Sequence, residues 1–192
     1  MDNIDQTFSI SEIKKAPRCT YVEVVTSRQT YRGYAVHDIS ERLLDILNNG
    51  SIVNKSGLTN DFLPLIEVEI YDLDGKKVDV TANCLLNKNN VLVVAECRTT
   101  SGELPPSKPF LYTLFQRKKP IWVNILVQDL TILGQVYIGQ DNTSVTALEV
   151  DGTFLPVTNA TISSRISPPH PEFDFLAVNK NQIISISETS IV

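Results

Sequence analysis

Short apolar runs recur along the chain, most of them alternating with polar residues, and turn-forming residues separate them. Alternation with a period of two is typical of a β-strand with one buried face, and a continuous Val, Ile and Leu run is typical of a strand buried on both faces. The pattern therefore predicts a mainly β fold. The expected strands are 21–26, 30–36, 65–72, 77–86 and 91–98 in the first half, and 121–128, 131–138, 153–163, 173–178 and 182–188 in the second.

The two sets of strands belong to one repeated unit. The step from Val22 to Gly33 equals the step from Val123 to Gly134, 11 residues (33 − 22 and 134 − 123). An FLP motif then precedes an Asn-Lys turn by 25 residues in both halves (87 − 62 and 179 − 154), and a glutamate follows that turn after 9 (96 − 87 and 188 − 179). Landmarks in one order at equal spacing indicate a tandem duplication.

The duplication predicts two tandem five-stranded small barrels as the domains of the chain. We assign residues 1–98 to the first barrel, 99–110 to a Pro- and Ser-rich linker and 111–192 to the second barrel. The copies differ in length only between the glycine and FLP, where the step is 29 residues (62 − 33) in the first and 20 (154 − 134) in the second. Loops tolerate such insertions better than strands do.

One or two short helices are expected beside the strands. ISERLLDILNN in the first half has leucines between positions 43 and 47 at helical spacing, Ser40 is a candidate N-cap, and Gly50 ends the segment. We expect this helix to close the open end of its own barrel. The equivalent DNTSVTALEVDG has no leucine stripe and predicts a turn or short strand. A second helix is expected from Ser9, whose spacing to Glu12 is that of a capping box.

The strand order resembles that of Sm-like small barrels. The residues that carry the resemblance are VEVVTSRQTYRGYAVHD in the first half and VNILVQDLTILGQVYIGQD in the second. RLLDILN and FLPL in the first half also resemble a bacterial protein family of unknown activity. The resemblance implies an Sm-like barrel in each half. Sm-like proteins contact RNA through an Arg-Gly step between their last two strands, and NKNN and NKNQ stand at that place here.

Composition narrows the classes of partner and compartment. The net charge of -5 disfavours binding to nucleic acid through a general positive field, because Lys and Arg supply most of the free energy of phosphate binding. No apolar stretch approaches the roughly 20 residues that span a bilayer, so membrane insertion is not expected. The three cysteines form no CxxC motif, and the polar N-terminus does not resemble a signal peptide. We therefore expect a cytoplasmic protein.

No arrangement of residues predicts catalysis, a metal site or a cofactor. His37 and His170 have no accompanying nucleophile and are expected to be surface histidines. Cys19, Cys84 and Cys97 lack the short paired spacing of zinc ligands and are expected to pack as small apolar side chains. We therefore predict no enzyme.

One basic and aromatic cluster near the linker is the candidate interaction surface. It comprises Phe110, Tyr112, Phe115, Arg117, Lys118, Lys119 and Trp122. The leading hypothesis is a non-catalytic protein–protein interaction or assembly module, with a protein partner or self-association, because duplicated barrels offer sheet edges and two related faces. The alternative is an RNA- or single-strand-binding tandem barrel that uses the basic cluster. A regulatory domain that binds a small ligand between the barrels, near His37, is the third.

Overall fold

Ten strands and one α-helix lie in the residues that the computed structural model describes, which are 18–38, 40–50, 61–97, 118–148, 151–164 and 172–189. The strands of the first half are β1 Arg18–Thr26, β2 Thr30–His37, β3 Phe62–Tyr71, β4 Lys77–Asn87 and β5 Val91–Glu96. Those of the second half are β6 Lys118–Val127, β7 Leu130–Gly139, β8 Phe154–Ser164, β9 Phe173–Asn179 and β10 Ile183–Glu188. Each matches one expected range. The mainly β prediction is confirmed.

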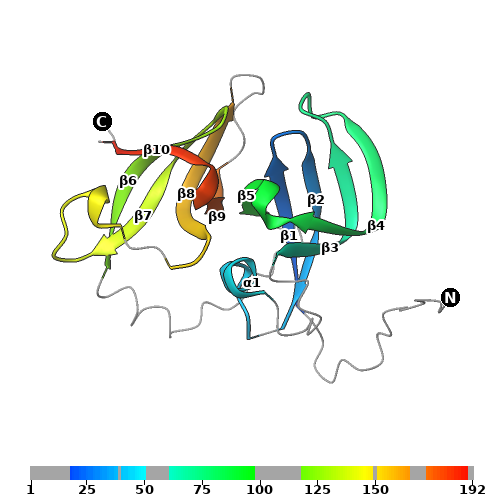
Figure 1. The fold of residues 1–192 in the computed structure, drawn as a ribbon, viewed down its shortest axis with the longest axis horizontal. Helices are drawn as coiled ribbons and strands as arrows, with labels where there is room; N and C mark the ends of the chain where they lie inside the picture. The colour runs from blue at the N-terminus through cyan, green and yellow to red at the C-terminus, as the bar shows by residue number, and fades with distance from the viewer. Residues whose placement is uncertain are drawn as a thin grey trace.

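All ten strands join one antiparallel sheet, in the order β10-β6-β7-β8-β9-β5-β1-β2-β3-β4. Each half contributes its own fifth, first, second, third and fourth strand in that order. The halves meet where β9 pairs with β5, near the centre of Figure 1, and the sheet ends at β4 and β10. The prediction of two tandem barrels is not confirmed, because the strands form one sheet that does not close. The expected linker lies outside the described residues.

The same bulge bends both halves. Gly33 lies opposite Val22 in β1, as Gly134 lies opposite Val123 in β6, and the pairing of the next strand shifts register beside each glycine. A Cβ on Gly33 would lie 2.9 Å from the Ile66 carbonyl oxygen, and one on Gly134 would lie 2.6 Å from a methyl of Val157. Only glycine therefore allows the adjacent strand to approach this closely, and a bulge of this kind increases the curvature of the sheet.

Left-handed residues mark that bulge in both halves. Glu67 in β3 has φ 51° and Asn159 in β8 has φ 49°, and their positions differ by 92 (159 − 67), as those of Phe62 and Phe154 do (154 − 62). Residue n of the first half thus corresponds to residue n + 92 of the second, from Phe62 onward.

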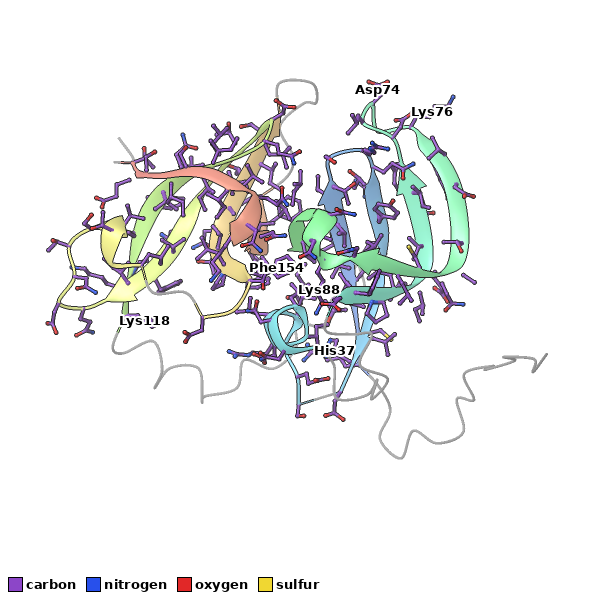
Figure 2. The ribbon with its side chains drawn as sticks, viewed as in Figure 1. His37, Asp74, Lys76, Lys88, Lys118 and Phe154 are labelled. Atoms are coloured by element: carbon purple, nitrogen blue, oxygen red, sulfur yellow. The ribbon has the colours of Figure 1, made fainter. Side chains whose placement is uncertain are left out.

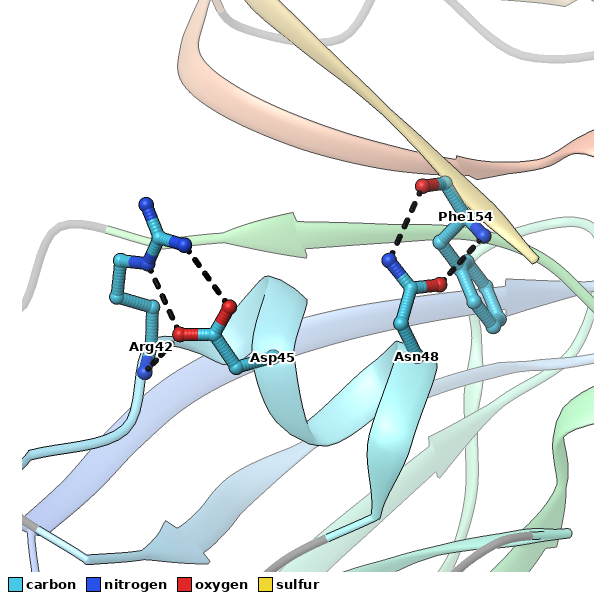
Figure 3. Close-up of polar contacts among 4 residues, drawn as sticks. All are labelled: Arg42, Asp45, Asn48 and Phe154. Carbon is cyan, nitrogen blue, oxygen red and sulfur yellow. Dashed lines mark hydrogen bonds and ion pairs between the residues drawn. The ribbon is translucent and has the colours of Figure 1, made fainter. Parts of the chain in front are cut away.

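The predicted helix of the first half is α1, Leu43–Asn49, and its cap differs from the expectation. Ser40 does not cap it. Its hydroxyl donates to Asp38 (2.6 Å), and the N-cap is Arg42. The Arg42 backbone N–H and guanidinium both donate to Asp45, and these hydrogen bonds lower the pKa of the carboxyl group (Figure 3). The helix expected at Ser9 lies outside the described residues.

The expected turn of the second half, DNTSVTALEVDG, contains a short 3-10 helix, η3 (Val145–Ala147). The two Asn-Lys turns are 3-10 helices as well, η2 (Lys88–Asn90) and η4 (Lys180–Gln182). In each of these two, the asparagine before the turn accepts a hydrogen bond from the backbone two residues on, a local bond that fixes the turn.

Two apolar cores fill the halves, and each contains side chains of the other half. The core of the first half packs α1 through Leu43, Ile46 and Leu47, and it also holds Phe154 and Ala177 from β8 and β9. The core of the second half includes Leu92, Val93 and Ala95 from β5. The halves therefore complete one another's cores. No described helix is long and apolar enough to cross a membrane.

Candidate interaction surface

The junction between β5 and β9 shows how this sheet binds a strand. Three residue pairs lie opposite one another: Val93 with Val178, Val94 with Ala177, and Ala95 with Leu176. All six are fully buried. Val94 and Ala177 face the core of the first half, whereas the other two pairs face the core of the second. Because both faces of this pairing are apolar, it excludes water on both sides of the sheet.

A buried asparagine fixes the polar part of the junction. The Asn179 amide nitrogen donates to the carbonyls of Lys88 (3.0 Å) and Val91 (2.9 Å), and its side-chain oxygen accepts from the Asn181 N–H (3.1 Å). Gln182 adds an exposed bond, from its side-chain nitrogen to the Asn89 carbonyl (2.9 Å). Asn179 thus joins the second half to two backbone carbonyls of the first half through buried hydrogen bonds.

Helix α1 holds the start of β8 from the other side of the junction. The Asn48 side-chain oxygen accepts from the N–H groups of Thr153 (2.9 Å) and Phe154 (2.8 Å), and its nitrogen donates to the Phe154 carbonyl (3.4 Å). Figure 3 shows the two bonds to Phe154. The fit is tight at Gly152, where a Cβ would lie 2.4 Å from the amide carbon of Asn48. These bonds place the Phe154 ring in the core of the first half.

Lys88 is buried beside the same helix (Figure 2). Its ammonium donates to the Ile46 carbonyl near the end of α1 (2.8 Å). Burial lowers its pKa to about 8, although the nearby Asp61 carboxylate acts in the opposite direction. The junction therefore contains a cation whose burial opposes folding at neutral pH.

The free edges of the sheet carry apolar side chains in solvent. Among the described residues, the exposed large apolar side chains include Val78, Val80 and Leu85 on β4 and Ile184 on β10. In Figure 1, β4 forms the right-hand margin of the molecule. An edge strand that leaves backbone groups unpaired and exposes apolar side chains is a template for another strand.

The junction residues equivalent to Leu85 and Ile184 are buried. Leu85 is 54% exposed, whereas Ala177, its equivalent on β9 (177 − 85 = 92), is 0% exposed. Ile184 is 64% exposed, and its equivalent Leu92 on β5 is 3% exposed. The β4 and β10 edges therefore expose two positions, Leu85 and Ile184, whose equivalents in the other repeat are buried at the β5–β9 junction.

The outer face of the first half carries a polar network. Arg32 pairs with the buried Glu23 (2.7 Å) and lies over the Tyr71 ring (4.7 Å from its centre). The Tyr71 hydroxyl donates to Glu69 (2.6 Å), which also pairs with Lys77 of β4. Because these contacts cross from β1 to β4, they fix the side chains of one face of the sheet up to its edge.

The predicted surface cluster is only partly visible in the described chain, and its parts separate. Phe110, Tyr112, Phe115 and Arg117 lie outside the described residues. The other three begin β6, where Lys118 is exposed and Lys119 and Trp122 are half-buried. Because successive side chains of a strand point to opposite faces, Lys118 shares a face with Trp122 whereas Lys119 lies on the other. The two described lysines therefore do not form one basic patch.

His37, Cys84 and Cys97 have structural surroundings, whereas Cys19 is exposed and does not pack as the small apolar side chain that was expected. His37 is buried rather than on the surface, and its ring nitrogens contact the Thr20 hydroxyl (2.8 Å) and the Asp38 carbonyl (2.9 Å). Burial raises the pKa of the Cys84 thiol, and that of Cys97 to about 11, so neither thiol is poised as a nucleophile. Within the described ranges, no three His, Cys, Asp or Glu side chains are grouped as metal ligands.

Comparison of the chain with protein-family models, with curated proteins and with solved structures gave no match.

Sequence reasoning missed the two edges, although a signal was present. Cys84, Leu85 and Leu86 form a continuous apolar run, which is typical of a strand buried on both faces, yet they belong to an edge strand. This run was the signal in the sequence for an edge strand that exposes apolar side chains.

Proposed function

We propose that this chain is a non-catalytic assembly module of the cytoplasm, built from two Sm-like barrel repeats, which binds protein through the open edges β4 and β10. One observation carries the proposal: Leu85 and Ile184 are exposed on these edges, whereas their equivalents Ala177 and Leu92 are buried where β5 meets β9.

The physical argument concerns what an edge strand exposes. A free edge presents a row of unpaired N–H and C=O groups, and proteins that do not use such an edge shorten it or protect it with charge, proline or a bulge. β4 is an 11-residue strand with apolar side chains in solvent. Added strands gain affinity from main-chain hydrogen bonds and specificity from alternate side chains, which both edges supply.

Site-specific photo-crosslinking of the full chain tests this function. A photoreactive amino acid replaces Leu85 or Ile184, with Leu133 of the interior strand β7 as the matched control, because Leu133 is also an exposed large apolar residue but its strand is paired on both sides. In an extract of the protein's own cells, we expect both edge positions to form adducts with polypeptide, including the chain itself, that Leu133 does not form. Equal adduct formation at all three positions, or none, would contradict the function.

A further inference from the structure

We infer that Asp151 is a site of spontaneous covalent modification: its side chain cyclises onto the backbone nitrogen of Gly152, reopens as isoaspartate, and in that form loosens the contact between α1 and β8. Asp151 and Gly152 lie directly before Thr153, where that contact begins. The inference goes beyond the proposed function, because it concerns the contact between the halves and not the edges of the sheet.

The reaction needs only the chain and water. The Gly152 backbone nitrogen attacks the side-chain carboxyl carbon of Asp151, and the carboxyl OH leaves with the amide proton as water, which gives a five-membered succinimide. Water then opens the ring. Breaking the new C–N bond restores aspartate, whereas breaking the original peptide bond leaves the chain connected through the side chain as isoaspartate. A following glycine favours the attack, because it has no side chain to hinder it.

Three Asp-Gly or Asn-Gly pairs lie among the described residues, and their glycines have similar backbones. The pairs are Asn49–Gly50, Asp74–Gly75 and Asp151–Gly152, and the glycine φ angles are 77°, 76° and 83°. The first residue of each pair is exposed. Neither the conformation of the glycine nor the solvent access of the side chain therefore distinguishes the three pairs.

Hydrogen bonding of the glycine nitrogen does distinguish them. The Gly50 N–H donates to the Ile46 carbonyl near the end of α1 (3.1 Å), and the Gly75 N–H donates to the Asp72 carbonyl across the β3–β4 turn (3.1 Å). The Gly152 N–H forms no hydrogen bond with any residue that the structure describes. A nitrogen that donates to a carbonyl must break that bond before it loses its proton and attacks. The third pair is therefore the one that the fold protects least.

The isoaspartate linkage lengthens the backbone by one atom at a place with little room. A Cβ on Gly152 would lie 2.4 Å from the amide carbon of Asn48. The next two N–H groups, those of Thr153 and Phe154, donate to the Asn48 side-chain oxygen, and Figure 3 shows the second of these bonds. An added atom beside Asn48 displaces this backbone, so we expect both hydrogen bonds to weaken. Because Asn48 belongs to α1, the modification loosens one half from the other.

Peptide mapping of the purified full chain, aged for weeks at neutral pH, tests the site. Fragmentation by electron transfer distinguishes isoaspartate from aspartate, and the mass gain of deamidation reports the reaction of Asn49. Each rate is divided by the rate at the same position in the chain unfolded in guanidinium chloride, so that the intrinsic reactivities of Asp and Asn cancel.

We expect folding to slow the reactions of Asn49 and Asp74 by at least about five-fold, since each requires the loss of one hydrogen bond. Folding should slow the reaction of Asp151 by a smaller factor than at either of the other two positions. Equal slowing at all three positions, or stronger slowing at Asp151, would overturn the assignment of the site.

Hydrogen exchange tests the consequence, with Asp151→Glu as the matched control. Glutamate keeps the charge, but its longer side chain would have to close a six-membered ring, which forms far more slowly. In the aged unmodified chain, the amides of Thr153 and Phe154 should lose protection in proportion to the isoaspartate content, whereas aged Asp151→Glu should keep it.

Asn48→Ala should lose the same protection without ageing, because it removes the acceptor of both bonds. Circular dichroism verifies that each variant folds, and if one does not, fresh and aged unmodified chains are compared directly. Isoaspartate at position 151 with unchanged protection at Thr153 and Phe154 would show that the modification does not loosen the contact, and would overturn the inference.

Discussion

The β5–β9 junction and the edges β4 and β10 are built from equivalent strands, yet they differ in what covers them. β5 has the sequence VLVVAE and is buried over most of its length, whereas its counterpart β10 reads IISISE and is largely exposed. β9 is mostly buried, and its counterpart β4 is mostly exposed. The two halves therefore bury equivalent strands at the junction and expose them at the edges, and the proposed function assigns strand binding to the exposed pair.

The largest expected effect contrasts the two equivalent phenylalanines. Phe154→Ala removes a ring that is fully buried across the junction, and we expect it to lower the free energy of unfolding by about 4 kcal/mol. Phe62→Ala is the matched change at the free edge, where the ring is half-buried, and should have less than half that effect. Urea denaturation at low protein concentration measures both. Equal losses would remove the distinction between the junction and the edge.

The next effect uses pH and the buried Lys88. Its pKa is about 8 in the folded chain and 10.5 in the unfolded chain, so the unfolded state binds more protons between these values. Stability from this residue therefore rises as pH rises through that window. Relative to Lys88→Met, the unmodified chain should gain up to about 3 kcal/mol between pH 7 and pH 10.5.

Urea denaturation of the unmodified chain and of Lys88→Met across that pH range measures the gain. Thiols and tyrosines titrate in the same range, but their contribution to stability is common to both proteins and cancels in the difference. Lys180→Met reports the same substitution at the equivalent position in the second half. A difference between the unmodified chain and Lys88→Met that does not change with pH would show that the junction does not hold Lys88 away from water.

A smaller effect contrasts the two asparagines. Asn179→Ala removes two buried hydrogen bonds, to the carbonyls of Lys88 and Val91, and we expect a loss of about 2 kcal/mol in thermal or urea unfolding. Asn87→Ala removes only the local turn bond in the isolated chain, so about 0.5–1 kcal/mol should be lost. A larger loss for Asn87 than for Asn179 in monomeric protein would contradict the assignment of the junction.

The smallest effect concerns α1, which only the first half contains among the described residues. Asp45 has a lowered pKa because Arg42 donates to it, so its contribution to stability is present above 3.8, its usual value, and is lost as pH falls through the lower folded value. The side chain is partly exposed and screened by solvent, so Asp45→Asn should lower stability by only about 0.5 kcal/mol at pH 7. Stability curves of both proteins should converge in acid; a constant gap would mean that charge is not the cause.

The strands were predictable from the sequence, because alternation of side chains depends only on local burial. The helix was predictable for the same reason, but its cap was not, since Asp45 and Arg42 form it in place of Ser40. The pairing of β5 with β9 is long-range and has no local signal beyond the continuous apolar run in VLVVAE. The interaction surface was predicted from the basic and aromatic residues near Lys118. The β4 and β10 edges were missed because they are recognised only when the strands of the two halves are compared one by one.

Hydrogen exchange of the purified full chain at low and high concentration tests the central claim most directly, because it reports backbone pairing at each strand. If β4 and β10 bind strands of other molecules, the amides of both edge strands should gain protection together as concentration rises, while those of the interior strand β7 keep one exchange rate. Exchange in β4 and β10 that is independent of concentration would contradict the account.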